Sequence, residues 1–275
     1  MNSPGMLTSP IGVFDSGIGG LTVAQAIHKA LPREEIVYIG DTAHMPYGDK
    51  SPELIRHYAH DISQCLIKQF HCKALVIACN TASASAYELL RDSFKGILPV
   101  INVIDPMVEY VISRNDLHHV GIIATKATVS SGVYQEKISR RKKELNYSVL
   151  STPLLAPMIE EGFYNNSISH AILHEYLSNE VLQGIDGLIL ACTHYPLIKP
   201  EISSFFDHKI PVIDSAEVVA AKLKHILEKE KLLNTADGFP NHHFYITDYS
   251  DHFVRTAKLF YGEQINLQRL NLSNE

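Results

Sequence analysis

The sequence of 275 residues contains no tryptophan, only four cysteines and no long hydrophobic run. Four cysteines in a chain of this length are too few for a disulfide-stapled scaffold. No apolar segment approaches the roughly 20 residues that a membrane-spanning helix needs. The first ten residues show neither the charged region nor the apolar region of a signal peptide. We therefore expect a soluble cytoplasmic protein with reduced thiols.

Neither sign of charge dominates the sequence. Lysine and arginine number 24 and aspartate and glutamate 30, which gives a net charge of −6 with neutral histidines. A dedicated nucleic-acid-binding protein usually carries a basic patch and a high isoelectric point, so this function class is disfavoured. A composition of 45% hydrophobic and 20% charged residues excludes disorder, collagen and coiled coil. The length lies near the roughly 250–300 residues at which one core tends to split into two.

Short apolar runs recur along the chain, and several lack polar alternation, which is typical of strands buried on both faces. The predicted strands are Ile11–Phe14, Ile36–Ile39, Leu75–Ala78, Val100–Ile104, Val120–Ala124, Leu188–Ala191 and Val212–Ile213. Helical patterns lie between them. Ser51-Pro52 and Asp105-Pro106 each pair a capping residue with proline at the first helical position, and Ala216–Lys231 forms a third helical pattern. The alternation predicts an α/β fold with parallel sheets.

Two pairs of segments in the sequence resemble each other, and we call this similarity the internal echo. Leu75–Thr81 and Leu188–His194 are both apolar strands that end in Ala-Cys and continue with polar residues. Gly12–Ser16 and Gly121–Thr125 repeat at a similar separation. Recurrence at nearly one offset indicates two related α/β halves. Because ligands bind at the carboxyl ends of parallel strands, we expect two pseudo-symmetric domains, each a mainly parallel sheet flanked by helices, with an active site in the cleft between them.

The echo places Cys79 and Cys192 on opposite sides of this cleft. Each cysteine stands where a strand ends and a helix is predicted to begin, and a helix N-terminus lowers the pKa of a thiol. Two facing thiols suit proton transfer at a carbon, one removing a proton and the other returning one to the opposite face. The alternative is a pair of buried core cysteines. The polar neighbours Asn80-Thr81 and Thr193-His194 favour function, whereas Cys65 and Cys72 are expected to be structural.

A glycine-rich segment, Asp15–Gly20, follows the first predicted strand. Its backbone N–H groups could form a nest for a carboxylate or phosphate. The alternative is a dinucleotide fingerprint with Asp41 as the ribose ligand, but Thr22 stands where its third glycine belongs. Asp15 could assist Cys79, hold a substrate amine or cap the next helix.

Other candidate features are weaker. Asp41–Gly48 is a turn-rich loop with Pro46-Tyr47-Gly48 at its end, and its alternative is a purely structural turn. His194 could orient the thiol of Cys192. The pairs His118-His119 and His242-His243 lack metal-ligand spacing, and the sequence contains no P-loop motif, so we expect neither a metal nor a cofactor.

Four segments together resemble glutamate racemase, of the aspartate/glutamate racemase superfamily. They are Val13–Leu21, Gly40–Gly48, Ala78–Ala82 and Ala191–Leu197. The resemblance implies cofactor-independent interconversion of L- and D-glutamate, which supplies D-glutamate for peptidoglycan, and commonly a homodimer. It also implies two domains, residues 1–102 with 215–275 and residues 103–214. The alternatives are racemisation of aspartate or another amino acid, a nucleotide-binding regulatory or redox protein, and an amino-acid sensor without catalysis.

The resemblance also implies residue roles. Cys79 matches the base that deprotonates D-glutamate and Cys192 the base that deprotonates L-glutamate, with Asp15, His194 and Glu160 as their polar assistants. The matching substrate-binding residues are Asp15, Ser16, Pro46, Tyr47, Gly48, Asn80, Thr81, Thr125, Thr128, Thr193 and His194. Two positions depart from the family pattern: His44 stands in place of a common arginine, and Ser151-Thr152-Pro153 in place of a Cys-Pro pair.

Overall fold

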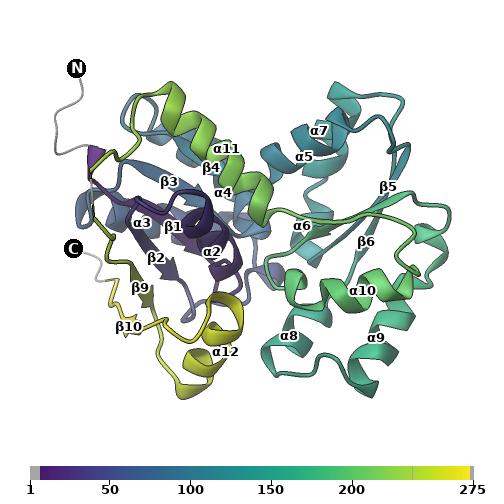
Figure 1. Cartoon of the computed structure of the whole chain (residues 1–275). Helices are drawn as coiled ribbons and strands as arrows, with labels where there is room; N and C mark the ends of the chain where they lie inside the picture. The colour runs from purple at the N-terminus through teal and green to yellow at the C-terminus, as the bar shows by residue number, and fades with distance from the viewer. Residues whose placement is uncertain (1–6, 237, 273–275) are drawn as a thin grey trace.

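The computed structural model describes residues 7–236 and 238–272 and contains two parallel β-sheets side by side (Figure 1). The first sheet has six strands in the order β10-β9-β2-β1-β3-β4, and the second has four in the order β6-β5-β7-β8. The strands of the first sheet are β1 (Ile11–Asp15), β2 (Ile36–Gly40), β3 (Ala74–Ile77), β4 (Val100–Asn102), β9 (His243–Ile246) and β10 (Leu267–Arg269). Those of the second are β5 (His119–Ala124), β6 (Asn146–Ser151), β7 (Gly187–Ala191) and β8 (Val212–Asp214).

Helices and short 3-10 turns connect the strands and cover the sheets. The helices are α2 (Leu21–Ala30), α3 (Pro52–Lys68), α4 (Asn80–Ser93), α5 (Ile104–Ser113), α6 (Lys126–Ser130), α7 (Val133–Arg141), α8 (Leu155–Glu160), α9 (Ser167–Leu177), α10 (Lys199–Phe205), α11 (Ala216–Lys229) and α12 (Asp251–Tyr261). The 3-10 turns are η1 (Tyr47–Asp49), η2 (Glu180–Leu182) and η3 (Tyr195–Ile198).

The two sheets share an internal repeat. The order β2-β1-β3-β4 in the first sheet matches β6-β5-β7-β8 in the second. Gly12 is paired with Leu75 in the first sheet, and Gly121 is paired with Leu188 in the second. These are the residues that the sequence echo aligns, and the predicted α/β class with parallel sheets is confirmed. The proposed domain boundaries stay a prediction, and their terminal residues 1–6 and 273–275 lie outside the described residues.

Several strands show no alternation of apolar and polar residues because both of their faces are buried. Along β1, Val13 belongs to a hydrophobic cluster that continues into the second sheet, whereas Phe14 belongs to a cluster on the opposite face. The first cluster extends to Ile122 of β5 and Leu188 of β7, so one continuous core joins the two sheets. Strands covered on both sides need apolar residues at successive positions.

Two helix starts test the sequence prediction. Ser51 caps α3 by accepting a hydrogen bond from the Leu54 N–H, as predicted. The second helix, α5, begins at Ile104 rather than at Pro106. The side chain of Asn102 accepts hydrogen bonds from the Ile104 and Asp105 N–H groups. The predicted strand Val100–Ile104 is therefore too long, because Asn102 ends it and starts the helix.

The prediction missed the strands β6, β9 and β10. All three carry alternating or polar sequence, and β6 and β10 lie at the edges of their sheets, where one side faces solvent. Such segments do not form the continuous apolar runs that mark a central strand.

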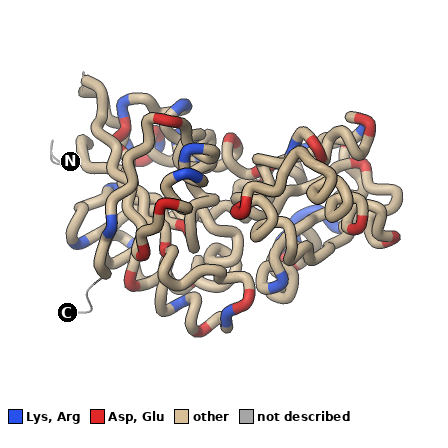
Figure 2. Tube along the Cα trace, turned by 90° about the horizontal axis from the view of Figure 1, so that it is seen from below, with Lys and Arg blue, Asp and Glu red and all other residues tan. Residues whose placement is uncertain are grey.

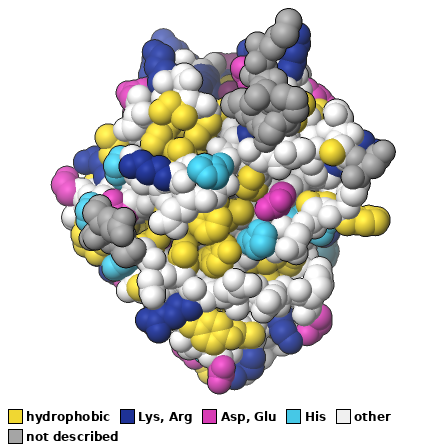
Figure 3. Space-filling view, turned by 90° about the vertical axis from the view of Figure 1, so that its left-hand side faces the viewer, with side chains coloured by type: hydrophobic (Ala, Val, Ile, Leu, Met, Phe, Trp, Pro, Cys, Tyr) yellow, Lys and Arg dark blue, Asp and Glu magenta, His cyan; other side chains and the backbone are white. Residues whose placement is uncertain are grey.

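The surface mixes charges of both signs. Acidic and basic residues are interspersed along the chain trace (Figure 2). On the face shown in Figure 3, hydrophobic, histidine and charged side chains lie intermingled. In the described part of the chain, no helix is both long and apolar enough to cross a membrane.

Candidate active site

The carboxyl ends of strands from both sheets meet around one cavity of about 320 Å³. Ser16, Cys79, Thr125 and Cys192 each follow a strand and contribute to its wall. The lining residues are Ser16, Met45, Pro46, Tyr47, Gly48, Asp49, Cys79, Asn80, Thr81, Thr125, Lys126, Thr152, Pro153, Ala156, Pro157, Glu160, Ala191, Cys192, Thr193, His194 and Tyr195. Of the site residues predicted from sequence, all but Asp15 and Thr128 stand in this wall among the described residues.

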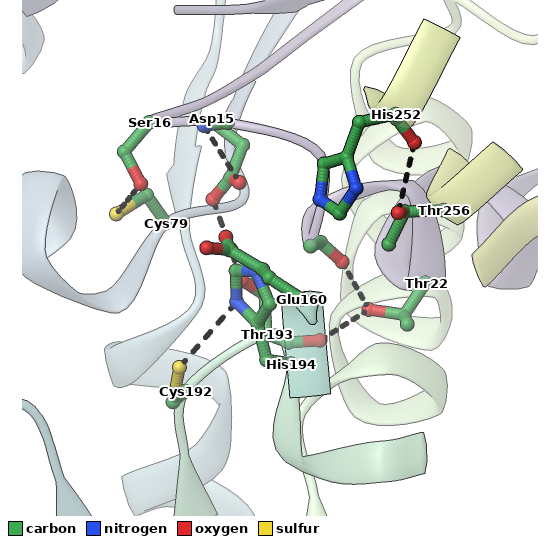
Figure 4. Close-up of polar contacts among 12 residues, drawn as sticks. Asp15, Ser16, Thr22, Cys79, Glu160, Cys192, Thr193, His194, His252 and Thr256 are labelled. Carbon is green, nitrogen blue, oxygen red and sulfur yellow. Dashed lines mark hydrogen bonds and ion pairs between the residues drawn. The ribbon is translucent and has the colours of Figure 1, made fainter. Parts of the chain in front are cut away.

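Cys79 lies two residues beyond the end of β3 and caps helix α4. Its sulfur accepts a hydrogen bond from the Ala82 N–H at 3.3 Å and donates to Ser16 Oγ at 3.5 Å (Figure 4). Burial raises the pKa of this thiol to about 12, and the nearby charge of Asp15 adds to the effect. The expectation that a helix N-terminus lowers this pKa is therefore wrong, because desolvation outweighs the hydrogen bonds that favour the thiolate.

Asp15 lies directly behind the cavity wall. Its carboxylate accepts hydrogen bonds from the Gly17 N–H at 3.1 Å and from Thr193 Oγ1 at 3.5 Å. Burial raises the pKa of Asp15, partly offset by the charge of His194. Helix α2 has no side-chain cap, so the capping role weighed for Asp15 is not what the structure shows. The carboxylate instead links the loop after β1 to the segment after β7.

Cys192 is the start of a hydrogen-bonded chain in the second half. Its sulfur lies 3.8 Å from His194 Nδ1, and His194 Nε2 lies 2.7 Å from Glu160 Oε1 (Figure 4). Burial alone would lower the pKa of His194, but the hydrogen bonds to Cys192 and Glu160 raise it well above the ordinary value. These two hydrogen bonds thus favour the protonated form of the ring beside the sulfur. The predicted helix start after Cys192 is a 3-10 turn, η3, rather than an α-helix.

The glycine-rich loop allows the two halves to approach closely. A Cβ atom on Gly19 would lie 2.5 Å from His194 Nδ1, so only glycine fits there. Thr22 Oγ1 bonds both the Gly19 carbonyl and the Thr193 carbonyl, at 2.9 and 3.2 Å. These contacts serve packing against the second half, and they disfavour the dinucleotide-binding alternative for this loop.

Asp41, the candidate ribose ligand of that alternative, is fully buried, and its carboxylate already has hydrogen-bond partners within the protein. Its carboxylate accepts from Tyr47 Oη at 2.6 Å and from Thr247 Oγ1 at 2.9 Å, and it lies 2.9 Å from His44 Nδ1. Asp41 therefore anchors the loop that carries Pro46, Tyr47 and Gly48 into the cavity wall.

Hydroxyl groups bridge the two halves at one end of the cavity. Thr81 Oγ1 lies 2.9 Å from Thr125 Oγ1 and 3.3 Å from Thr128 Oγ1. Thr125 also caps α6 by accepting from the Thr128 N–H. Thr128 is buried behind the wall, so its contact with the cavity is made through the other two threonines. A Cβ atom on Gly48 would lie 3.2 Å from Thr125 Cβ, which keeps this junction narrow.

Sequence reasoning missed nine lining residues, namely Met45, Asp49, Lys126, Thr152, Pro153, Ala156, Pro157, Ala191 and Tyr195. Most of them adjoin predicted site residues along the chain. Thr152 and Tyr195 come from separate segments and meet with their hydroxyl oxygens 2.7 Å apart. Lys126 and Asp49 form an exposed ion pair of 3.7 Å between the two halves. Proximity to the motifs would have found the neighbours, but the Thr152–Tyr195 contact depends on the fold of the second half and the Lys126–Asp49 pair on how the two halves are placed.

The remaining candidates lie elsewhere. Cys65 and Cys72 are buried in the hydrophobic cluster beside α3, which confirms the structural role predicted for them. The described residues contain no group of three or more histidine, cysteine, aspartate or glutamate side chains placed to hold a metal ion.

Comparison with known proteins places this geometry in a family. The Asp/Glu/Hydantoin racemase family matches residues 11–223. Glutamate racemase of Geobacter metallireducens is 39% identical over 93% of this chain and 93% of its own, and that of Chlorobaculum parvum is 40% identical over 94% of each. The crystal structure of Francisella tularensis glutamate racemase in complex with D-glutamate superposes with a TM-score of 0.89, at 39% identity, over 97% of this chain and 98% of that chain.

These similarities cover nearly the whole chain. They confirm the resemblance to the glutamate racemases inferred from the four motifs, and with it the assignment to the amino-acid racemases, a class of isomerase. The chain belongs to the Asp/Glu/Hydantoin racemase family.

Proposed function

We propose that this protein interconverts L- and D-glutamate by moving the α-proton between Cys79 and Cys192, without a cofactor. The observation that carries the proposal is that both cysteines line one cavity from equivalent strand ends, Cys79 after β3 and Cys192 after β7. The relatives at 39–40% identity are glutamate racemases, and one of the similar crystal structures contains D-glutamate.

The proposed reaction is balanced by the two sulfurs. With L-glutamate, the thiolate of Cys192 takes the α-proton, so a C–H bond breaks and an S–H bond forms. The thiol of Cys79 then gives its proton to the opposite face of the carbanion, and D-glutamate results. With D-glutamate the two cysteines exchange roles.

The surroundings of the two sulfurs differ. His194 Nδ1 lies 3.8 Å from the sulfur of Cys192, and its hydrogen bonds favour the protonated ring, so it is placed to stabilise negative charge that develops on that sulfur. A pKa of about 12 keeps Cys79 protonated near neutral pH. In the proposed reaction of L-glutamate, Cys79 is therefore the proton donor and Cys192 the base.

The α-proton of an amino acid is only weakly acidic, so the site has to stabilise the developing negative charge. The hydroxyl groups of Thr81 and Thr125 are fixed donors in the cavity wall. Preorganised donors of this kind lower the barrier more strongly where water is excluded. We expect the two halves to close on the substrate during proton transfer.

Racemisation in D2O tests the two-base proposal. Each enantiomer should yield a product with deuterium at Cα, and product without α-deuterium in both directions would contradict the mechanism.

Cys79→Ser and Cys192→Ser should each lower kcat by at least about 100-fold, within the range typical of general acid–base groups. Cys65→Ser is the matched control, since Cys65 is a buried thiol bonded to Gln69 Oε1 outside the cavity wall.

The cellular role, location and assembly belong to the same proposal. The resemblance to the family implies supply of D-glutamate for peptidoglycan and a homodimer, and the sequence composition predicts a cytoplasmic location. Assaying glutamate and aspartate side by side measures substrate choice, and a higher kcat/KM for aspartate would replace glutamate in the proposal. Complementation of a D-glutamate auxotroph and sedimentation of the purified protein test the cellular role and the dimer.

A further inference from the structure

One polar group in the cavity wall lacks a hydrogen-bond partner. The side chain of Asn80 is 2% exposed, and its Nδ2 is buried without a partner among the described residues. A buried N–H group without a partner is costly unless a ligand or water completes it. Because Asn80 lines the cavity, the open donor is available to a bound molecule.

The other atom of this amide is held by the opposite half of the protein. Tyr134, on α7, donates its hydroxyl hydrogen to Asn80 Oδ1 at 2.8 Å. Tyr134 is 2% exposed. Burial raises the pKa of Tyr134 and keeps its hydroxyl protonated. The hydrogen bond therefore joins α7 of the second half to the first turn of α4.

The direction of this bond decides what Asn80 presents to the cavity. A protonated tyrosine that donates to Oδ1 leaves the NH2 group of Asn80 as the free group. With the amide turned around, the carbonyl oxygen would be free, and the tyrosine hydrogen would have lost its acceptor. A free NH2 group attracts an anionic carboxylate, whereas a free carbonyl oxygen repels it.

We propose that Tyr134 is a positioning residue that fixes the amide of Asn80 with its NH2 group toward a carboxylate of the substrate. The inference rests on the proposed function for the identity of that carboxylate. Since the bond spans the two halves, Asn80 is correctly oriented only when α7 and α4 lie together as they do here.

The test is Tyr134→Phe, which removes one hydroxyl and retains the ring. KM should rise about 10-fold for both enantiomers while kcat changes less than about threefold, because a contact made equally in ground and transition states affects KM alone. The matched control is Tyr261→Phe. Tyr261 is also 2% exposed and bonds His28 Nδ1 at 2.8 Å, outside the cavity wall, so its KM should not change.

A double-mutant cycle separates positioning from a general structural role. In an Asn80→Ala background, Tyr134→Phe should change KM less than twofold, because the group that it orients is gone. A full 10-fold effect in that background would overturn the proposal, as would an unchanged KM in the single variant. Asn80→Asp, which replaces the donor with an acceptor, should weaken binding at least as much as Asn80→Ala.

Calorimetric binding of D-glutamate gives a readout independent of catalysis. The Kd for D-glutamate should rise about 10-fold in Tyr134→Phe and stay unchanged in Tyr261→Phe. If the wild-type protein binds D-glutamate but does not racemise it, the proposed function fails and these Kd values still decide the role of Tyr134. If the wild type binds no glutamate, both proposals fail.

Discussion

His194 is the residue in which burial and hydrogen bonding oppose each other most clearly. Two partners hold its ring, Cys192 at Nδ1 and Glu160 at Nε2. Their effect on its pKa exceeds that of burial, so the folded protein keeps this proton to higher pH than the unfolded chain does. The two hydrogen bonds thus favour a cation beside Cys192, where the proposed mechanism needs a thiolate.

This raised pKa makes a prediction about stability. The contribution of His194 is fully present below the unfolded pKa of about 6.5 and is lost as the pH rises above it, by up to about 1.4 kcal/mol per pH unit. The difference in the free energy of unfolding between wild type and His194→Gln should therefore be largest near pH 6 and shrink toward pH 9. Chemical denaturation across this range measures it.

His242 provides a control of opposite sign. Burial, with the charges of His28 and His243, lowers its pKa to about 4. Its contribution to stability is present above pH 6.5 and is lost as the pH falls toward 4. His242→Gln should therefore change stability in the acid range only. The same pH trend in both variants would contradict the assignment for His194.

Among the elements, the end of β9 has an unexpected role in the site. Thr247, just after this strand, donates to Asp41 and accepts from the Ala43 N–H at 2.9 Å. Thr42 Oγ1 bonds the Asp248 carbonyl at 2.6 Å beside it. The loop that brings Tyr47 to the cavity is therefore held by a strand that lies about 200 residues later in the chain.

Thr247→Val should consequently weaken both the fold and substrate binding. It removes two hydrogen bonds and leaves the buried carboxylate of Asp41 with one donor fewer, at a cost of about 1–3 kcal/mol. We expect an increase in KM for glutamate and a lower Tm. Thr256→Val is the control, because Thr256 is a buried threonine whose hydroxyl bonds only the His252 carbonyl of its own helix. Equal KM values for Thr247→Val and wild type would refute the anchoring role.

The elements also show how far sequence patterns reach. Central strands such as β1 and β7 were predictable because burial on both faces forces a continuous apolar run. The edge strand β6 was not, because its side chains are half-exposed and its sequence, NYSVLS, is mostly polar. Helix α3 was predictable from its cap, whereas the start of α5 depends on the Asn102 side chain, which the pattern assigned to a strand.

At the scale of the whole molecule, the two halves meet across the cavity through side chains of both. Lys126 and Asp49 form an ion pair there, and each is more than 60% exposed. Lys126 is the only lysine or arginine among the described lining residues. An exposed pair contributes at most about 1 kcal/mol, so a carboxylate of the substrate can compete with Asp49 for the lysine.

Lys126→Gln should therefore raise the KM for glutamate by about 3–10-fold and weaken the dependence of kcat/KM on ionic strength. Asp49→Asn frees the lysine and should have the opposite effect on KM. Steady-state kinetics at several salt concentrations measure both. A KM for Lys126→Gln equal to that of wild type would show that the lysine does not contact the substrate. Thermal stability should change little in either variant.

The placement of the two halves also explains which site residues could be predicted from the sequence. Cys79 and Cys192 stand in repeated motifs, so their placement in the wall of one cavity was predictable from the internal echo. Tyr134 and Lys126 carry no motif, and their roles arise only when the second half is placed against the first. The pKa of Cys79 was predicted in the wrong direction because position at a helix start says nothing of how completely the fold removes water.

The anchoring of Asp41 by Thr247 also has a consequence for protein synthesis. During synthesis, the loop bearing Tyr47 emerges from the ribosome long before the threonine that secures it. A nascent chain can assemble most of both sheets and still have an unsupported wall on one side of its cavity. Full activity should therefore appear only on completed polypeptides, so that a truncated fragment lacking the last thirty or so residues would fold in part and catalyse poorly.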